Sequence, residues 1–86
     1  MNLIVSPIFK EKLAGFSPEI KNLIRKKLDL FVDNPKHLSL QSKKMQGTEY
    51  IFESRINRSI RFTWQYMGEA IVLRNIGYHD PTLKNP

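Results

Sequence analysis

The segment YIFESRINRSIRFTWQY, residues 50–66, constrains the fold more than any other part of the chain. Its apolar side chains recur at every second position. This period predicts two β-strands, because successive side chains on a strand point to opposite faces of a sheet. The face that can pack on a core carries Tyr50, Phe52, Ser54, Ile56, Ile60, Phe62, Trp64 and Tyr66.

The other face of the same two strands carries charged residues. If the strands pair around a three-residue loop, Arg55 lies opposite Arg61 and Glu53 lies opposite Thr63. Like charges directly opposite on a sheet destabilise it by up to about 1 kcal/mol. Two interpretations remain open: a solvated face with one weak salt bridge, or a face that binds phosphate and contains a carboxylate.

Two helices are predicted ahead of this hairpin, after a short strand at residues 2–6. Each helix begins at a Ser-Pro pair, Ser6-Pro7 and Ser17-Pro18, because serine caps the first backbone amides and proline fits the first turn. Apolar residues recur at helical spacing through the second helix. It ends at Asn34, because the residue before a proline is disfavoured in the α conformation.

The order of elements predicts an α+β fold. Residues 34–47 are interpreted as a polar connection, and residues 70–76 as a third strand after a tight turn. The result is an N-terminal strand, a helical hairpin and a three-stranded antiparallel meander, joined in one sheet with the helices on one face. Residues 1–86 are expected to form a single domain.

The composition excludes several kinds of site and favours an anionic partner. The chain contains no cysteine and two histidines, so disulfides and thiolate-zinc sites are excluded, and no metal or cofactor is expected. The beginning, MNLIVSPIFK, has neither the basic region nor the long apolar run of a secretory signal. A cytoplasmic protein without a membrane span is expected. The net charge of +6 favours an anionic partner, such as nucleic acid, a membrane surface or an acidic protein.

Further candidate residues flank the charged strands. Lys43 and Lys44 precede the hairpin, and Arg74 lies on the third strand. His79 follows that strand on what is predicted to be an exposed loop, where a histidine can exchange protons near neutral pH. A histidine in such a position, taken alone, is more often an ordinary surface residue.

These segments, taken in order, resemble the RelE/ParE superfamily of bacterial toxins from type II toxin–antitoxin systems. The resemblance runs from the helical hairpin ending in DNP, through KKMQG and YIFESRINRSIRFTWQY, to IVLRNIGYHD, and so covers nearly the whole chain. It implies a compact sheet like that of the microbial ribonucleases, with an N-terminal helical hairpin.

The resemblance to RelE-like members also implies an activity. These toxins enter the ribosomal A site and cut mRNA without a metal, by attack of the RNA 2′-hydroxyl on the adjacent phosphate, and a tightly bound antitoxin neutralises them. It implies Glu53 as general base, Arg61 as the cation for the transition-state charge and His79 as general acid. The phosphate- and RNA-binding residues predicted with them are Lys43, Lys44, Arg55, Arg58, Arg74 and Tyr78.

Two alternatives to RNA cleavage remain. ParE-like members share the fold but inhibit DNA gyrase without catalysis, and a basic domain retained only to bind its antitoxin is a third hypothesis. Glu53 and His79 favour the ribonuclease, because a gyrase inhibitor needs no acid–base pair. The aromatic residue that many RNA-cutting members place after the last strand is missing unless Tyr78 substitutes for it.

Overall fold

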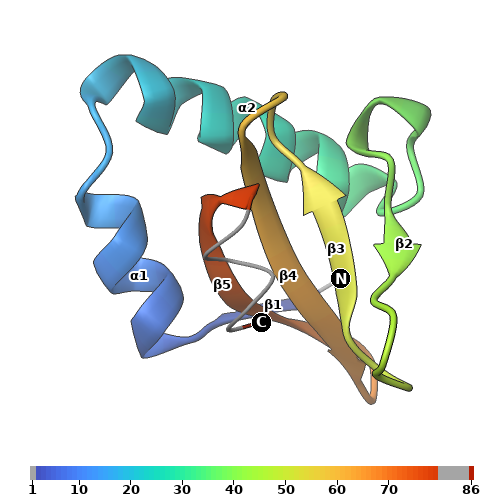
Figure 1. Ribbon diagram of the computed structural model, residues 1–86. Coiled ribbons are helices and arrows are strands. Elements are labelled where there is room, and N and C mark those ends of the chain that lie inside the picture. The colour runs from blue at the N-terminus through green and yellow to red at the C-terminus, as the bar shows by residue number, and fades with distance from the viewer. Residues whose placement is uncertain (1, 80–85) are drawn as a thin grey trace.

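The computed structural model describes residues 2–79 and 86, which form a five-stranded mixed sheet and two helices (Figure 1). The sheet order is β1-β5-β4-β3-β2. The predicted α+β class is confirmed. The elements are β1 Asn2–Val5, α1 Pro7–Ala14, α2 Pro18–Asp33, the short 3-10 helix η1 Leu38–Leu40, β2 Lys43–Lys44, β3 Phe52–Arg55, β4 Ile60–Met67 and β5 Ala70–Tyr78.

Both predicted serine caps are confirmed. The Ser6 hydroxyl accepts a hydrogen bond from the backbone amide of Phe9 at 3.1 Å, and the Ser17 hydroxyl accepts one from Ile20 at 3.3 Å. The Ser6 hydroxyl also donates to the main-chain oxygen of Arg74 at 2.6 Å. Ser6 therefore fastens the start of α1 to the middle of β5, whereas the bond of Ser17 is local to α2.

Replacing Ser6 by alanine is expected to destabilise the fold more than the same change at Ser17. An N-cap serine contributes about 1 kcal/mol, and the lost bond to Arg74 adds about 1 kcal/mol more. Urea unfolding at unchanged slope should give a loss of about 2 kcal/mol for Ser6→Ala and about half of that for Ser17→Ala. Equal losses would show that the bond to β5 adds nothing.

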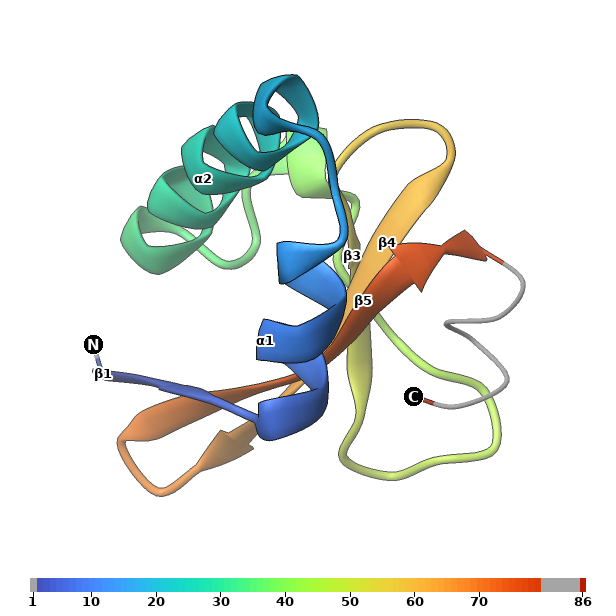
Figure 2. The same ribbon diagram turned by 90° about the vertical axis from the view of Figure 1, so that its left-hand side faces the viewer.

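The core lies between the helices and one face of the sheet. Figure 2 shows α2 on one side of the sheet, with the C-terminal end of the chain on the other side. Phe31 of α2 is fully buried and meets Phe62 and Trp64 of β4 edge-on, at ring-centroid distances of 5.1 and 5.0 Å. The predicted apolar face of β4 is thus the core face. In the described part of the chain, no helix has the length and apolar character required to cross a membrane.

The register predicted for the hairpin is confirmed. Arg55 pairs with Arg61 and Glu53 pairs with Thr63. The loop also has the predicted length, since the backbone amide of Ile56 donates to the oxygen of Ile60. The charged residues of the two strands therefore share the face opposite the helices. The N-terminal strand β1 joins the sheet by parallel pairing with β5.

Part of residues 34–47, which were interpreted as a polar connection, forms regular structure. Lys43 and Lys44 form strand β2, which pairs antiparallel with β3 and places Lys43 opposite Glu53. The preceding η1 buries Leu40 completely. The sheet thus has one strand more than the predicted N-terminal strand and meander. Two lysines show no alternation of polarity, and only backbone pairing with β3 makes them a strand.

The third predicted strand, residues 70–76, extends to Tyr78 and contains a β-bulge. Thr63 pairs with Asn75 whereas the next residue, Trp64, pairs with Leu73, so Arg74 is the extra residue of β5. Because side chains alternate at every residue, one extra residue exchanges the faces of all that follow. Ile76 is thereby turned into the core, and His79 is turned to the charged face.

Candidate active site

The charged face of the sheet contains a cavity of about 330 Å³ beside the β3–β4 hairpin. It brings together the three predicted catalytic residues, Glu53, Arg61 and His79, from three different parts of the sequence. The complete lining is Gln41, Lys43, Glu53, Ser54, Arg55, Arg61 and His79. A carboxylate, guanidinium groups and an imidazole therefore border one polar hollow.

Glu53 lies in the middle of β3 and is only 6% exposed. Lys43 of the neighbouring strand places its Nζ 3.6 Å from Glu53 Oε1. The ammonium group is largely exposed, so this ion pair is of the weak surface kind.

Arg61 is held against the loop that joins β3 and β4. Its Nη1 donates to the main-chain oxygens of Asn57 at 2.6 Å and Arg58 at 3.0 Å. Burial lowers the pKa of Arg61, the charge of Arg55 lowers it further, and the carboxylate of Glu53 raises it. An arginine remains cationic despite such shifts. Arg61 is therefore a fixed positive charge whose direction is set by the loop backbone.

Arg55 adds a second cation opposite Arg61. Its Nε is buried and, among the described residues, has no hydrogen-bond partner. A buried donor without a partner costs about 1–3 kcal/mol. An oxyanion between the two guanidinium groups would supply the missing acceptor and would reverse their mutual repulsion. This pair supports the phosphate-binding interpretation of the face over a merely solvated one.

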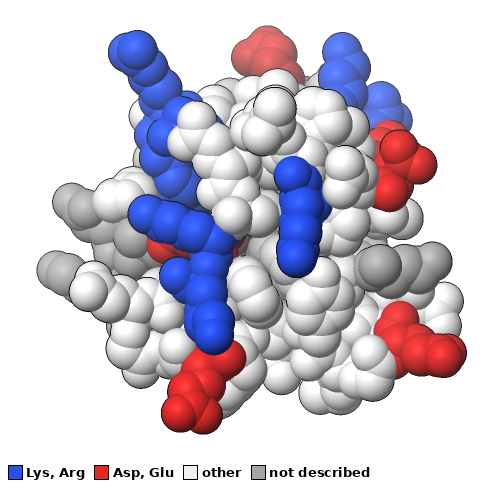
Figure 3. All heavy atoms as spheres, turned by 90° about the vertical axis from the view of Figure 1, so that its right-hand side faces the viewer, with Lys and Arg blue, Asp and Glu red and all other residues white. Residues whose placement is uncertain are grey.

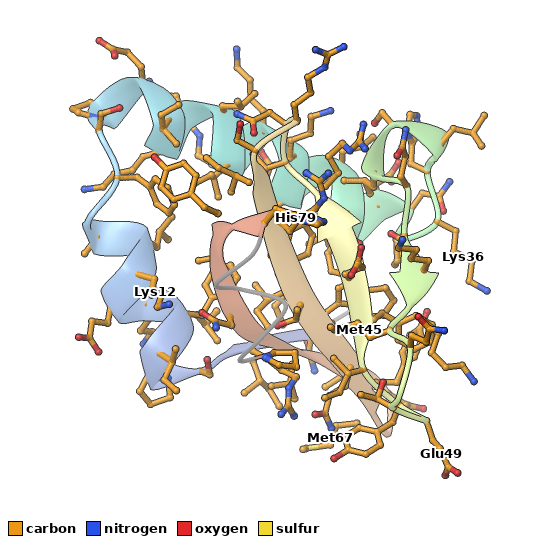
Figure 4. All side chains as sticks on the ribbon, viewed as in Figure 1. Lys12, Lys36, Met45, Glu49, Met67 and His79 are labelled. Atoms are coloured by element: carbon orange, nitrogen blue, oxygen red, sulfur yellow. The ribbon has the colours of Figure 1, made fainter. Side chains whose placement is uncertain are left out.

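His79 reaches the cavity from the end of β5. Its backbone amide donates to the oxygen of Ser59 at 2.9 Å, so the pairing with the β3–β4 loop continues past the last strand residue. Figure 4 shows the His79 side chain at the tip of β5, directed toward β3. The residue is exposed. The imidazole thus stands on the open side of the hollow, whereas Glu53 lies at its buried side.

Four predicted contact residues lie outside this cavity. Lys44 and Arg58 are exposed on β2 and in the β3–β4 loop, and Arg74 donates to a main-chain oxygen of Pro86. Tyr78 lies on the opposite face of the sheet from His79, with its ring 6.2 Å from that of Phe16. The structure therefore gathers Lys43 and Arg55 with the catalytic candidates, but does not gather these four.

Two lining residues were not predicted, Gln41 and Ser54. Gln41 has a left-handed backbone, with φ of 46°, a conformation that few residues other than glycine adopt. Ser54 accepts a hydrogen bond from Trp64 Nε1 at 2.8 Å and lies 2.5 Å from the Ser42 hydroxyl, which donates to the Pro35 oxygen. The Ser54 hydroxyl must therefore donate to Ser42. The resulting chain of bonds fastens the loop before Lys43 to the core.

No signal in the sequence identifies these residues as part of a site. A serine in an alternating strand pattern is an ordinary polar residue. The sequence of a loop does not show that a glutamine in it has a left-handed backbone. Figure 3 views the molecule from the β2 side, where basic side chains surround and partly cover a recessed acidic one. In residues 2–79 and 86 there is no group of three or more His, Asp or Glu side chains that could hold a metal ion.

The fold has close counterparts among solved structures, although no family model and no curated protein sequence matches the chain. A YoeB/ParE toxin from Agrobacterium tumefaciens superposes with a TM-score of 0.76 at 13% identity, over 92% of this chain and 99% of that one. The YoeB–YefM complex from Staphylococcus aureus gives 0.75 at 19% identity, over 92% and 97% of the two chains. The intact RelBE toxin–antitoxin complex of Escherichia coli gives 0.72 at 15% identity, over 92% and 96%.

These similarities extend over almost the full length of each chain. The chain therefore has the same fold as these toxins. The resemblance predicted from the ordered sequence segments is therefore confirmed at the level of the fold.

Proposed function

We propose that this protein is the toxin of a type II toxin–antitoxin pair, and that it cleaves mRNA on the ribosome. The observation that carries the proposal is the single cavity bordered by Glu53, Arg55, Arg61 and His79. A carboxylate, two guanidinium groups and an imidazole are the groups that metal-independent RNA cleavage requires. The toxins that share this fold support the toxin role.

In the proposed reaction the RNA supplies its own nucleophile. Glu53 takes the proton of the 2′-hydroxyl, and the 2′-oxygen forms a bond to the adjacent phosphorus. Arg55 and Arg61 stabilise the charge on the phosphoryl oxygens. The bond from phosphorus to the 5′-oxygen breaks, and protonated His79 gives its proton to that oxygen. The products are a 2′,3′-cyclic phosphate and a 5′-hydroxyl.

An antitoxin is the second proposed partner. Two of the superposed structures are complexes of a toxin with its antitoxin. The net charge of +6 suits an acidic protein and favours rapid association with it. Covering the charged face would block the cavity, and this is how we propose that the antitoxin silences the toxin.

Replacing Arg61 by alanine is expected to abolish growth inhibition while the protein stays folded. The change removes a cation whose direction is fixed beside the scissile phosphate, and the loss of one such group costs about 10²–10³ in rate. The measurement is colony formation after induction at matched expression. Arg25→Ala, which removes an exposed arginine from α2, is the matched control and should remain toxic.

Primer extension on cellular mRNA after brief induction tests the cleavage itself. New 5′ ends within translated regions, present for the wild type and absent for Arg61→Ala, are the expected result. Intact mRNA together with double-strand breaks at gyrase sites would instead establish the ParE-like alternative. If Arg61→Ala remained fully toxic, Arg61 would not be part of the active site.

A further inference from the structure

We propose that Thr63 and Arg74 form a second anion subsite, which holds a phosphodiester next to the one that is cleaved. This inference rests on the proposed function and deepens it. The two donors converge on one acceptor: Thr63 Oγ1 and Arg74 Nε both donate to a main-chain oxygen of Pro86, at 2.9 and 3.0 Å. A hydroxyl and a guanidinium that donate to the same oxygen can donate in the same way to one phosphoryl oxygen.

The subsite is rigid because each donor is fixed. Thr63 is fully buried in the middle of β4. Arg74 is the extra residue of the bulge, its main-chain oxygen accepts from the Ser6 hydroxyl, and its Nη1 donates to Gln65 Oε1. These bonds set the direction of the guanidinium before any ligand arrives. Pre-organised donors bind a ligand more tightly because they lose little conformational entropy on binding.

The subsite is continuous with the cavity that holds Glu53. Glu53, Thr63 and Asn75 are direct partners across β3, β4 and β5. Neighbouring strands lie about 4.8 Å apart, so Thr63 is one strand away from the proposed base. An RNA strand that crosses the sheet at right angles to β4 would therefore meet the cleavage cavity first and the Thr63–Arg74 pair next.

A second cavity, of about 410 Å³, adjoins the pair and suits the base of the flanking nucleotide. Its walls include Pro7, Ile8 and Val72 as well as Arg74. Ile8 is 55% exposed at the start of α1, so its side chain is accessible at this wall. An apolar wall beside an arginine can accept the flat face of a nucleobase while the guanidinium holds its phosphate.

Pro86 occupies the subsite in this structure. Its main-chain oxygen stands where a phosphoryl oxygen of the RNA would lie, so RNA must displace it. Binding at Thr63 and Arg74 is therefore a competition between this main-chain oxygen and a phosphoryl oxygen of the RNA, to which Arg74 makes a charge-assisted bond.

The test measures binding and not cleavage. Glu53→Gln protein, which is expected not to cut, is titrated with a short fluorescent single-stranded RNA and with copies carrying one neutral methylphosphonate at each linkage in turn. Adding Arg74→Ala or Thr63→Val should weaken binding of the all-phosphate RNA about tenfold or more. Arg74→Ala should also reduce the slope of log K against log salt by about 0.7, the value for one single-strand phosphate contact.

The methylphosphonate series identifies the linkage. Neutralising one particular linkage should weaken binding of the RNA to the starting protein, but should cause no further loss of affinity when Arg74 is alanine. This is the result expected when that linkage and Arg74 form one contact. Arg25→Ala also removes one positive charge, but from α2. It should not change the effect of neutralising any one linkage, and it should not lower the salt slope by about 0.7. Thermal unfolding of each variant confirms that the fold is retained.

Two results would overturn the proposal. One is unchanged affinity and salt slope in both Arg74→Ala and Thr63→Val; the other is a starting protein that does not bind the RNA measurably. These outcomes are separate from the failure of the proposed function. If the subsite contact is found in a protein that cuts no mRNA on ribosomes, the RNA subsite stands and the cleavage proposal fails.

Discussion

Replacing Glu53 by glutamine is expected to lower the rate of mRNA cleavage on the ribosome by about 10²–10⁴. Glutamine keeps the size of the side chain but cannot take the proton of the 2′-hydroxyl. The measurement is single-turnover cleavage of ribosome-bound mRNA with toxin in excess, so that product release does not set the rate. Glu69→Gln, in the exposed turn between β4 and β5, is the matched control and should cut at the rate of the wild type.

The pH dependence separates the two proposed proton-transfer groups. If one group must accept a proton and another must donate one, the rate of the wild type should rise and then fall with increasing pH. Glu53→Gln should remove the rising limb and His79→Gln the falling limb. A wild-type rate independent of pH, unaltered by both changes, would leave these side chains a binding or structural role and would refute the acid–base mechanism.

Replacing Phe31 by alanine is expected to have the largest effect on stability. The ring is fully buried between Phe62 and Trp64, so its removal leaves a cavity where α2 meets the sheet. Such changes cost about 3–5 kcal/mol, which is a large part of the stability of a small domain. Urea unfolding followed by circular dichroism gives the value.

Leu38→Ala is the control for this change, because Leu38 is 89% exposed and should lose almost nothing. A loss below about 1 kcal/mol for Phe31→Ala would mean that the helix closes onto the sheet without the ring. In that case the contact between α2 and β4 would not be the main support of the charged face.

The hairpin that carries the site was predictable because two strong signals agree there. Alternation from Phe52 to Trp64 fixes which face is buried, and the loop length fixes that Arg55 meets Arg61. One face must enter the core, so a slip of one residue would bury charges and is strongly disfavoured. The pairing of Glu53 with Thr63 follows from the same argument.

The parts that escaped prediction lack such agreement. Strand β2 consists of Lys43 and Lys44, and only the neighbouring backbone makes it a strand. The bulge at Arg74 leaves no mark in composition, yet it decides that His79 faces Glu53 and not the core. The resemblance to RelE-like toxins supplied His79 as a candidate, whereas the geometric reason for its placement could be obtained only from the structure.

The bond from Trp64 to Ser54 has a practical consequence for spectroscopy. Trp64 is the single tryptophan of the chain, and its indole nitrogen donates to a serine that borders the cavity. Indole emission responds to the polarity and hydrogen bonding around that nitrogen. The ring also stacks on Phe52 at 4.6 Å, in contact with the core. Ultraviolet fluorescence of the unlabelled protein therefore reports, from one ring, the melting of the core around this bond.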